Sequence, residues 1–152
     1  MEMKKLLTGA ALLLTLAVSG APARAQAGPE TVVANLYRAA TAKSVAEMSK
    51  TQLRKYFDEG LADDIWKAAR GEEGLGFDLL YHAQDTRIRN FRVGKYEEGG
   101  RFWGWVTVSF TNFGERRKIN FKVTSATGGA GWRIADVSYA DGSTLSQILL
   151  PQ

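Results

Sequence analysis

The sequence predicts an α+β fold, in which amino-terminal helices pack on a curved, four-stranded antiparallel meander sheet. In the first half, apolar residues recur every three or four positions, which is the period of an amphipathic helix. After Asp85 they alternate with polar residues, which is the period of a half-buried strand. Short glycine-containing turns separate the alternating segments, so consecutive strands are expected to pair as hairpins. The helices must then cover the apolar face of the sheet, and its curl can leave a cavity between the two layers.

Three helical segments are expected before the sheet. The first begins at residues 28–30, where a proline suits the first helical turn. Its apolar residues share one face: Val32, Val33, Leu36, Tyr37 and Ala40. Capping boxes at 44–47 and 49–52 predict a second helix, which Gly60 can end. A third is expected at 62–69.

Turns at 98–100, at Gly114 and at 128–131 divide the second half into four strands, the last beginning at Trp132. Several side chains of the middle strands are expected on the apolar face: Phe102, Val106, Val108, Phe110, Ile119, Phe121 and Val123. Apolar residues at 145–149 predict a short closing helix or an extended tail.

The amino terminus has the pattern of a secretory signal peptide. Lys4 and Lys5 precede an apolar run at 6–18, and small residues at 21–25 offer a cleavage site. The run is shorter than the roughly 20 apolar residues that span a bilayer. We therefore predict a signal peptide at 1–25, a single α+β domain at 26–152, location in the periplasm or outside the cell, and no stable membrane anchor after cleavage.

Composition excludes several classes of chemistry. The chain has no cysteine and a single histidine, so disulfides, thiolate metal sites and cysteine nucleophiles are excluded. We predict neither a cofactor nor a metal. Residues 1–25 hold three of the 20 basic residues and one of the 16 acidic ones, so their removal lowers the net charge from +4 to +2. So small a charge does not favour nucleic acid as a partner.

Three short motifs resemble a bacterial exported family called domain of unknown function 3828. They are Ala-Gln-Asp at 83–85, Trp-Arg-Ile-Ala-Asp-Val at 132–137 and Gly-Ser-Thr-Leu at 142–145. The resemblance extends over about 31–149, and it implies an exported protein with the cone-shaped fold of nuclear transport factor 2. It implies no reaction, because the wider superfamily includes isomerases, dehydratases, ligand carriers and protein-binding adaptors.

The candidate catalytic residues are Asp85, Asp136 and His82. A carboxylate held in an apolar cavity can act as a general acid or base. His82 lies three residues before Asp85 and could orient it across a turn. The structural alternative is that each carboxylate accepts hydrogen bonds and stabilises a turn, with a bulge turning Asp136 outward.

The candidate binding residues are Trp103, Trp105, Tyr81 and Gln84. The two tryptophans are expected on the sheet face opposite Val106, beside threonine and serine. Tryptophan is enriched at interface centres, so a protein partner or a homodimer could bind there. Alternatively, the closing segment could cover both indoles.

Basic residues also collect on the predicted strands, at Arg87, Arg89, 116–118 and Lys122. They could face an anionic ligand, a lipid head group or an acidic partner. They could equally form a solvated sheet edge that discourages aggregation.

Non-enzymatic binding of a small apolar ligand or of a protein partner is the function these features favour. Two alternatives stay open. One is a lyase or isomerase that uses carboxylates, and the other is an envelope inhibitor or immunity protein that neutralises a toxin or a lysozyme-like enzyme.

Overall fold

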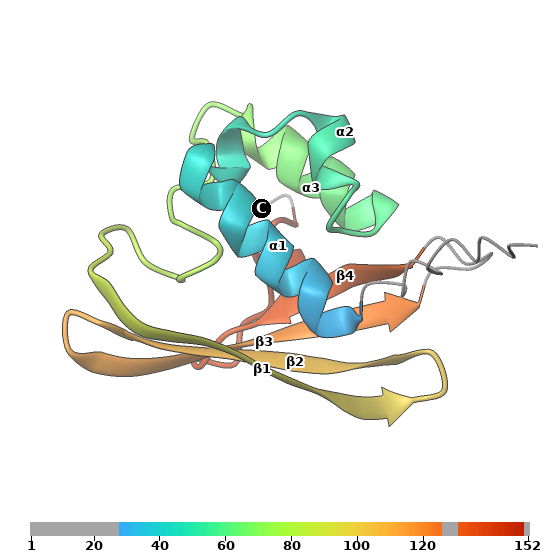
Figure 1. Ribbon diagram of the computed structural model, residues 1–152. Coiled ribbons are helices and arrows are strands. Elements are labelled where there is room, and N and C mark those ends of the chain that lie inside the picture. The colour runs from blue at the N-terminus through green and yellow to red at the C-terminus, as the bar shows by residue number, and fades with distance from the viewer. Residues whose placement is uncertain (1–27, 126–130, 151–152) are drawn as a thin grey trace, which may run out of the picture.

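The computed structural model describes residues 28–125 and 131–150 and places the helices over one face of a four-stranded sheet (Figure 1). The α+β prediction is therefore confirmed. The predicted signal peptide at 1–25 and most of the predicted turn at 128–131 lie outside the described residues. In chain order the elements are α1 (Pro29–Ala42), the 3-10 helix η1 (Val45–Glu47), α2 (Lys50–Leu53), α3 (Glu59–Ala69), β1 (Ile88–Gly100), β2 (Trp103–Asn112), β3 (Glu115–Ser125), β4 (Trp132–Ser138) and α4 (Leu145–Ile148).

The sheet is the predicted meander. Its strand order is β1-β2-β3-β4, and every neighbouring pair is antiparallel. Along β2, buried and half-buried residues alternate, so Val106, Val108 and Phe110 face the core. Their partners on β3 include Phe121 and Ile119, which are equally buried. The apolar face of the sheet is therefore continuous across its two central strands.

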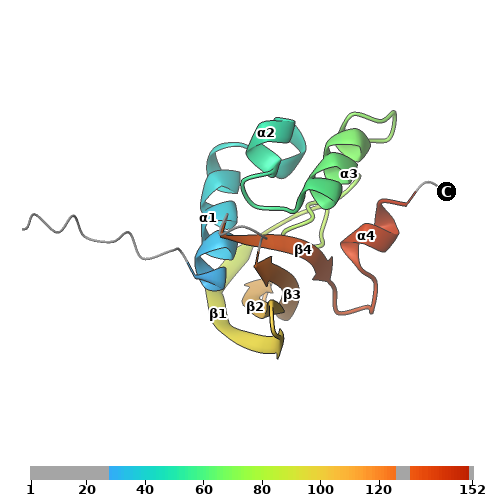
Figure 2. The same cartoon turned by 90° about the vertical axis from the view of Figure 1, so that its right-hand side faces the viewer.

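Helix α1 covers this face. It contacts all four strands, including the two edge strands β1 and β4, so the sheet curls around it (Figure 2). Val33 and Leu36 on its inner side are fully buried in the same cluster as Phe121. The first turn of α1 also holds β1, because the Glu30 carboxylate accepts the Tyr96 N–H at 2.7 Å. Core side chains thus fill the space between α1 and the sheet.

The second helical segment differs from the prediction. Both capping boxes form, but each begins only a short helix, η1 or α2. The chain then pairs with the edge of β4, since Ile134 donates to the Tyr56 carbonyl and Asp58 donates to the Ile134 carbonyl. Asp58 caps α3 by accepting the Leu61 N–H, so Gly60 lies in the first turn of α3 instead of ending a helix.

The first hairpin also differs. β1 continues through Gly100, and Arg101 and Phe102 form the turn. Phe102 is 60% exposed, so its predicted place on the apolar face was wrong. The Trp103 ring lies on Gly99 and Gly100, where an added Cβ would come within 2.3–2.4 Å of it. The two glycines therefore serve as a flat strand surface for the indole rather than as the turn.

The closing segment forms the helix α4, not an extended tail. Thr144 caps it, Leu145 is fully buried in the core, and the helix packs beside β4 (Figure 2). Among the helices in the described part of the chain, none has the length and apolarity needed to cross a bilayer.

The close contact at Gly104 gives a test of the sheet. A Cβ on Gly104 would lie 2.2 Å from the Glu97 carbonyl oxygen and 2.4 Å from the Tyr96 ring. Gly104→Ala should therefore lower the free energy of unfolding by roughly 1–3 kcal/mol, measured by urea denaturation. Gly60→Ala is the control: its Cβ would meet only the Asp58 carboxylate at 3.8 Å, so it should be neutral or slightly stabilising. Equal stabilities for the two variants would contradict this packing.

Candidate functional site

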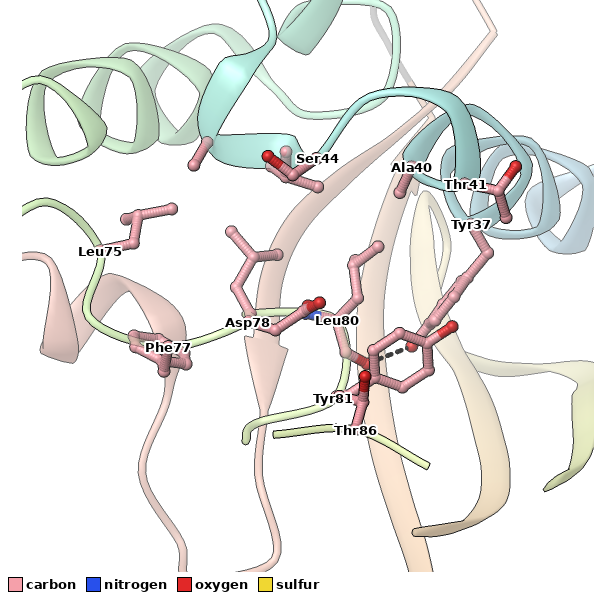
Figure 3. Close-up of a pocket in the computed structure, with 13 residues that line it drawn as sticks. Tyr37, Ala40, Thr41, Ser44, Leu75, Phe77, Asp78, Leu80, Tyr81 and Thr86 are labelled. Carbon is pink, nitrogen blue, oxygen red and sulfur yellow. Dashed lines mark hydrogen bonds between the residues drawn. The ribbon is translucent and has the colours of Figure 1, made fainter. Parts of the chain in front are cut away.

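A pocket of about 460 Å³ opens at the carboxyl-terminal end of α1 (Figure 3). That volume lies within the range of small-molecule sites. Its walls come from the end of α1, from the η1 region and from the segment that links α3 to β1. The lining residues are Tyr37, Ala40, Thr41, Ser44, Val45, Ala46, Leu75, Phe77, Asp78, Leu79, Leu80, Tyr81 and Thr86.

The wall of the pocket combines an apolar interior with polar groups near its opening. Val45, Leu79 and Leu80 are buried, and Leu75 and Phe77 are half-buried against the core. Exposed polar residues complete the lining: Thr41, Ser44, Asp78 and Thr86. Such a site can enclose an apolar group while hydrogen-bonding a polar end.

Two buried tyrosines hold the pocket segment in place from opposite sides. The Tyr37 hydroxyl on α1 donates to the Leu80 carbonyl at 2.6 Å (Figure 3). The Tyr139 hydroxyl, just after β4, donates to the adjacent Leu79 carbonyl at 2.9 Å. Burial raises the pKa of both phenols, so both remain protonated donors at neutral pH. We call these two bonds the tyrosine clamp.

Asp78 is the carboxylate of the pocket. It lies at the exposed rim, where its Oδ1 accepts the Leu80 N–H at 2.9 Å and its backbone carbonyl accepts the His82 N–H at 2.7 Å. The surrounding protein atoms nevertheless desolvate the carboxyl group and raise its pKa, an effect partly offset by the backbone N–H groups of Leu80 and Tyr81. Asp78 therefore shapes the turn and presents an acceptor to the pocket.

Sequence reasoning did not single out Asp78 as a site residue. One signal was available, since this acid interrupts the apolar run from Leu75 to Tyr81, which has neither helical nor strand periodicity. An acid in such a run must find hydrogen bonds or remain at a surface. Here it does both.

His82 does not pair with Asp85. Its ring stacks on Tyr139 at 4.0 Å between centroids, and its Nε2 lies 3.9 Å from Oδ2 of Asp141. The backbone at His82 is left-handed, with φ of 51°. Asp85 is exposed, and its backbone carbonyl accepts from the Asn112 side chain.

Asp136 lies away from the pocket and holds α4. Its Oδ1 accepts the N–H of Val137 at 2.8 Å and that of Ser146 at 3.1 Å, and its Oδ2 accepts the Ser146 hydroxyl. The β3–β4 register shifts beside it, since Lys122 pairs with Asp136 but the next residue of β3 pairs with Ile134. The residues proposed for catalysis are therefore not brought together, and none of them lines the pocket.

The candidate binding residues divide between two places. Tyr81 lines the pocket and contacts the rings of Tyr37 and Phe110 edge-on. Gln84 is exposed and outside the lining. Trp103 and Trp105 lie half-buried on the outer face of the sheet, 6.1 Å apart between ring centroids, and α4 packs beside β4.

Within 28–125 and 131–150, no group of three histidine or acidic side chains is placed to hold a metal ion.

Comparison with known proteins adds one structural likeness. No family model matches the chain, and no curated protein matches it. Among solved structures, the chain resembles a phospholipid-binding protein from Ralstonia solanacearum determined in complex with a phospholipid. The two are 15% identical, the match covers 77% of this chain and 68% of the other, and the TM-score is 0.37. At that level the likeness says nothing of what this chain binds.

The tyrosine clamp can be tested by removing its hydroxyls. Tyr37→Phe and Tyr139→Phe each leave a buried carbonyl without its donor, so each should lower the free energy of unfolding by about 1–3 kcal/mol. Tyr56→Phe is the control, because its half-buried ring packs on the core while its hydroxyl donates to no residue in the described part of the chain. Urea denaturation gives the values, and a loss equal to that of the control would refute the clamp.

The structural role of Asp136 predicts a defect in stability. Asp136→Asn replaces one acceptor oxygen by a donor, so the Ser146 bonds weaken and the free energy of unfolding should fall by about 1–2 kcal/mol. Adding Ser146→Ala should cost much less in this variant than in the wild-type protein, because the same bonds are already lost. Additive losses in a double-mutant cycle would contradict the pairing.

Proposed function

We propose that the chain is a small-ligand-binding domain. Its ligand is a molecule with an apolar body and an end that donates hydrogen bonds. The observation that carries this is the pocket itself, an apolar wall with polar groups gathered at its rim. Pockets of this size and composition are the usual form of small-molecule sites.

The lining suggests how the ligand lies. Its apolar body would contact Leu75, Phe77 and Ala40 in the interior of the pocket. Its polar end would face the Asp78 carboxylate, and Thr41 and Ser44 line the same pocket. A carboxylate accepts hydrogen bonds, so a hydroxyl or amine end suits this rim best.

The tyrosine clamp supports a binding role, because it holds the pocket in a fixed shape. A pocket whose segment is already tied to α1 and to the end of β4 loses little conformational entropy when a ligand enters. The pocket is therefore preorganised, which favours a specific ligand.

The geometry favours binding over catalysis. A lyase or isomerase in this pocket would have to use Asp78, because Asp85 and Asp136 do not line it. The Asp78 carboxylate already accepts a backbone N–H and shapes its own turn. Inhibition of a toxin or lysozyme-like enzyme, homodimer formation, export, and membership of the family named domain of unknown function 3828 stay predictions from the sequence.

Filling the pocket tests the proposal. Ala40→Leu adds an isopropyl group inside the pocket, whereas Ala42→Leu makes the same change at an exposed position near the end of the same helix. The probe is N-phenyl-1-naphthylamine, an apolar molecule with one N–H donor, and binding is followed by its fluorescence. Ala40→Leu should weaken binding about tenfold or more, since overpacking costs about 1–3 kcal/mol.

The control variant Ala42→Leu should bind the probe as the wild-type protein does. Both variants should keep their thermal unfolding transitions, which separates loss of binding from loss of fold. Unchanged binding in Ala40→Leu, or no saturable binding to the wild-type protein, would overturn the proposal.

A further inference from the structure

The outer face of the sheet carries a cluster of cations at one end. Residues opposite each other on antiparallel strands share a face, so the register places Arg92 and Lys118 on either side of Ser109. It likewise places Arg89 and Arg116 on either side of Thr111. We call these four residues the basic cluster: Arg89, Arg92, Arg116 and Lys118.

The basic cluster has no internal compensation. All four residues are exposed, and none of them forms an ion pair with any residue in the described part of the chain. The four cations lie on β1 and β3, which flank β2 on the same face of the sheet. Like charges gathered on one face repel one another, which costs stability unless anions gather there. The carboxylates that the register directs to this face lie nearer the opposite end, where Glu97 pairs with Trp105 and Asp136 is bonded to Ser146.

Aromatic residues occupy that opposite end, and we call them the aromatic end: Phe102, Trp103 and Trp105. The two indoles meet edge to face, and the Lys122 ammonium lies 4.9 Å from the Trp103 ring. Phe102 at the hairpin turn is 60% exposed, with the Arg101 guanidinium 5.1 Å from its ring. Exposed aromatic groups beside cations are typical of surfaces that enter the interfacial layer of a membrane.

This face is long, and away from its β4 edge, where α4 meets Asp136, the described helices leave it uncovered. From Trp103 to Thr111 the strand advances eight residue steps, roughly 27 Å at strand spacing. The helices α1, α2 and α3 lie over the other face, and α4 lies beside β4 (Figures 1 and 2). A single small anion could occupy only one end of such a surface, so an occupant that contacts both ends must be extended.

We propose that the outer face of the sheet docks on an anionic phospholipid bilayer. The basic cluster contacts head-group phosphates, and the aromatic end enters the interface. A bilayer satisfies both ends at once, because it offers negative charge at its surface and an apolar layer just beneath. A soluble polyanion or an acidic protein would use the basic cluster but would gain less from the exposed Phe102.

Vesicle binding tests the cluster. The protein is expressed with its own amino-terminal sequence. Mass spectrometry identifies the first residue of the purified product, and all variants compared must begin at that same residue. Co-sedimentation is measured with mixed phosphatidylglycerol–phosphatidylcholine vesicles and with pure phosphatidylcholine. The wild-type protein should bind the mixed vesicles more tightly, and added salt should weaken that binding.

A matched pair of variants locates the contact. Arg92→Gln with Lys118→Gln should weaken binding roughly 25-fold, at about fivefold for each cation lost near the surface. Lys55→Gln with Lys67→Gln removes the same charge from exposed positions in the helical layer and should bind like the wild-type protein. Equal losses in the two double variants would overturn the proposal, as would tight binding to soluble polyphosphate without binding to vesicles.

Quenching of tryptophan fluorescence tests which face of the protein meets the bilayer. The result does not depend on whether residues 1–27 also contact the vesicle. Brominated lipids should quench the indole fluorescence, and Trp105→Phe should reduce that quenching. Trp66→Phe should leave it unchanged, because Trp66 lies in the helical layer with Lys50 and Arg70 each 4.6 Å from its ring. Quenching that depends on Trp66 instead of Trp105 would overturn the proposal. Neither test involves the pocket, so the ligand-binding proposal stands or falls separately.

Discussion

Burial of one face of the central strands beneath α1 is the constraint on which the other features depend. Val106 on β2 and Phe121 on β3 present that face, and Leu36 of α1 is buried against it. Alternation of side chains along a strand means that removing one face from water leaves the other exposed. The helix therefore defines both an inner side, where the pocket forms at its end, and an outer side, where cations and indoles remain.

The pocket exists because an aperiodic segment is tied to elements that are distant in sequence. Tyr37 reaches a carbonyl 43 residues away, and Tyr139 reaches the neighbouring carbonyl 60 residues away. Without periodicity, the segment 75–86 has little secondary structure of its own to order it. Because its polar backbone groups are bonded to side chains, its leucines can be buried while Asp78 remains at the rim. The same bonds that stabilise the fold thus preorganise the site.

The two sides of the molecule suit different chemistry. The pocket offers apolar walls and one carboxylate, whereas the outer face offers exposed cations and partly exposed aromatic rings.

Local pattern by itself determined the fold class, the meander order and both capping boxes, because period and capping depend on neighbouring residues. It also placed Trp103 and Trp105 on the outer face, since alternation decides that once the core face is known. Only the tertiary structure decided that His82 meets Asp141, that Asp136 holds α4, and that the pocket lies at the end of α1 rather than under the sheet. Those outcomes depend on contacts between distant segments, which no local period encodes.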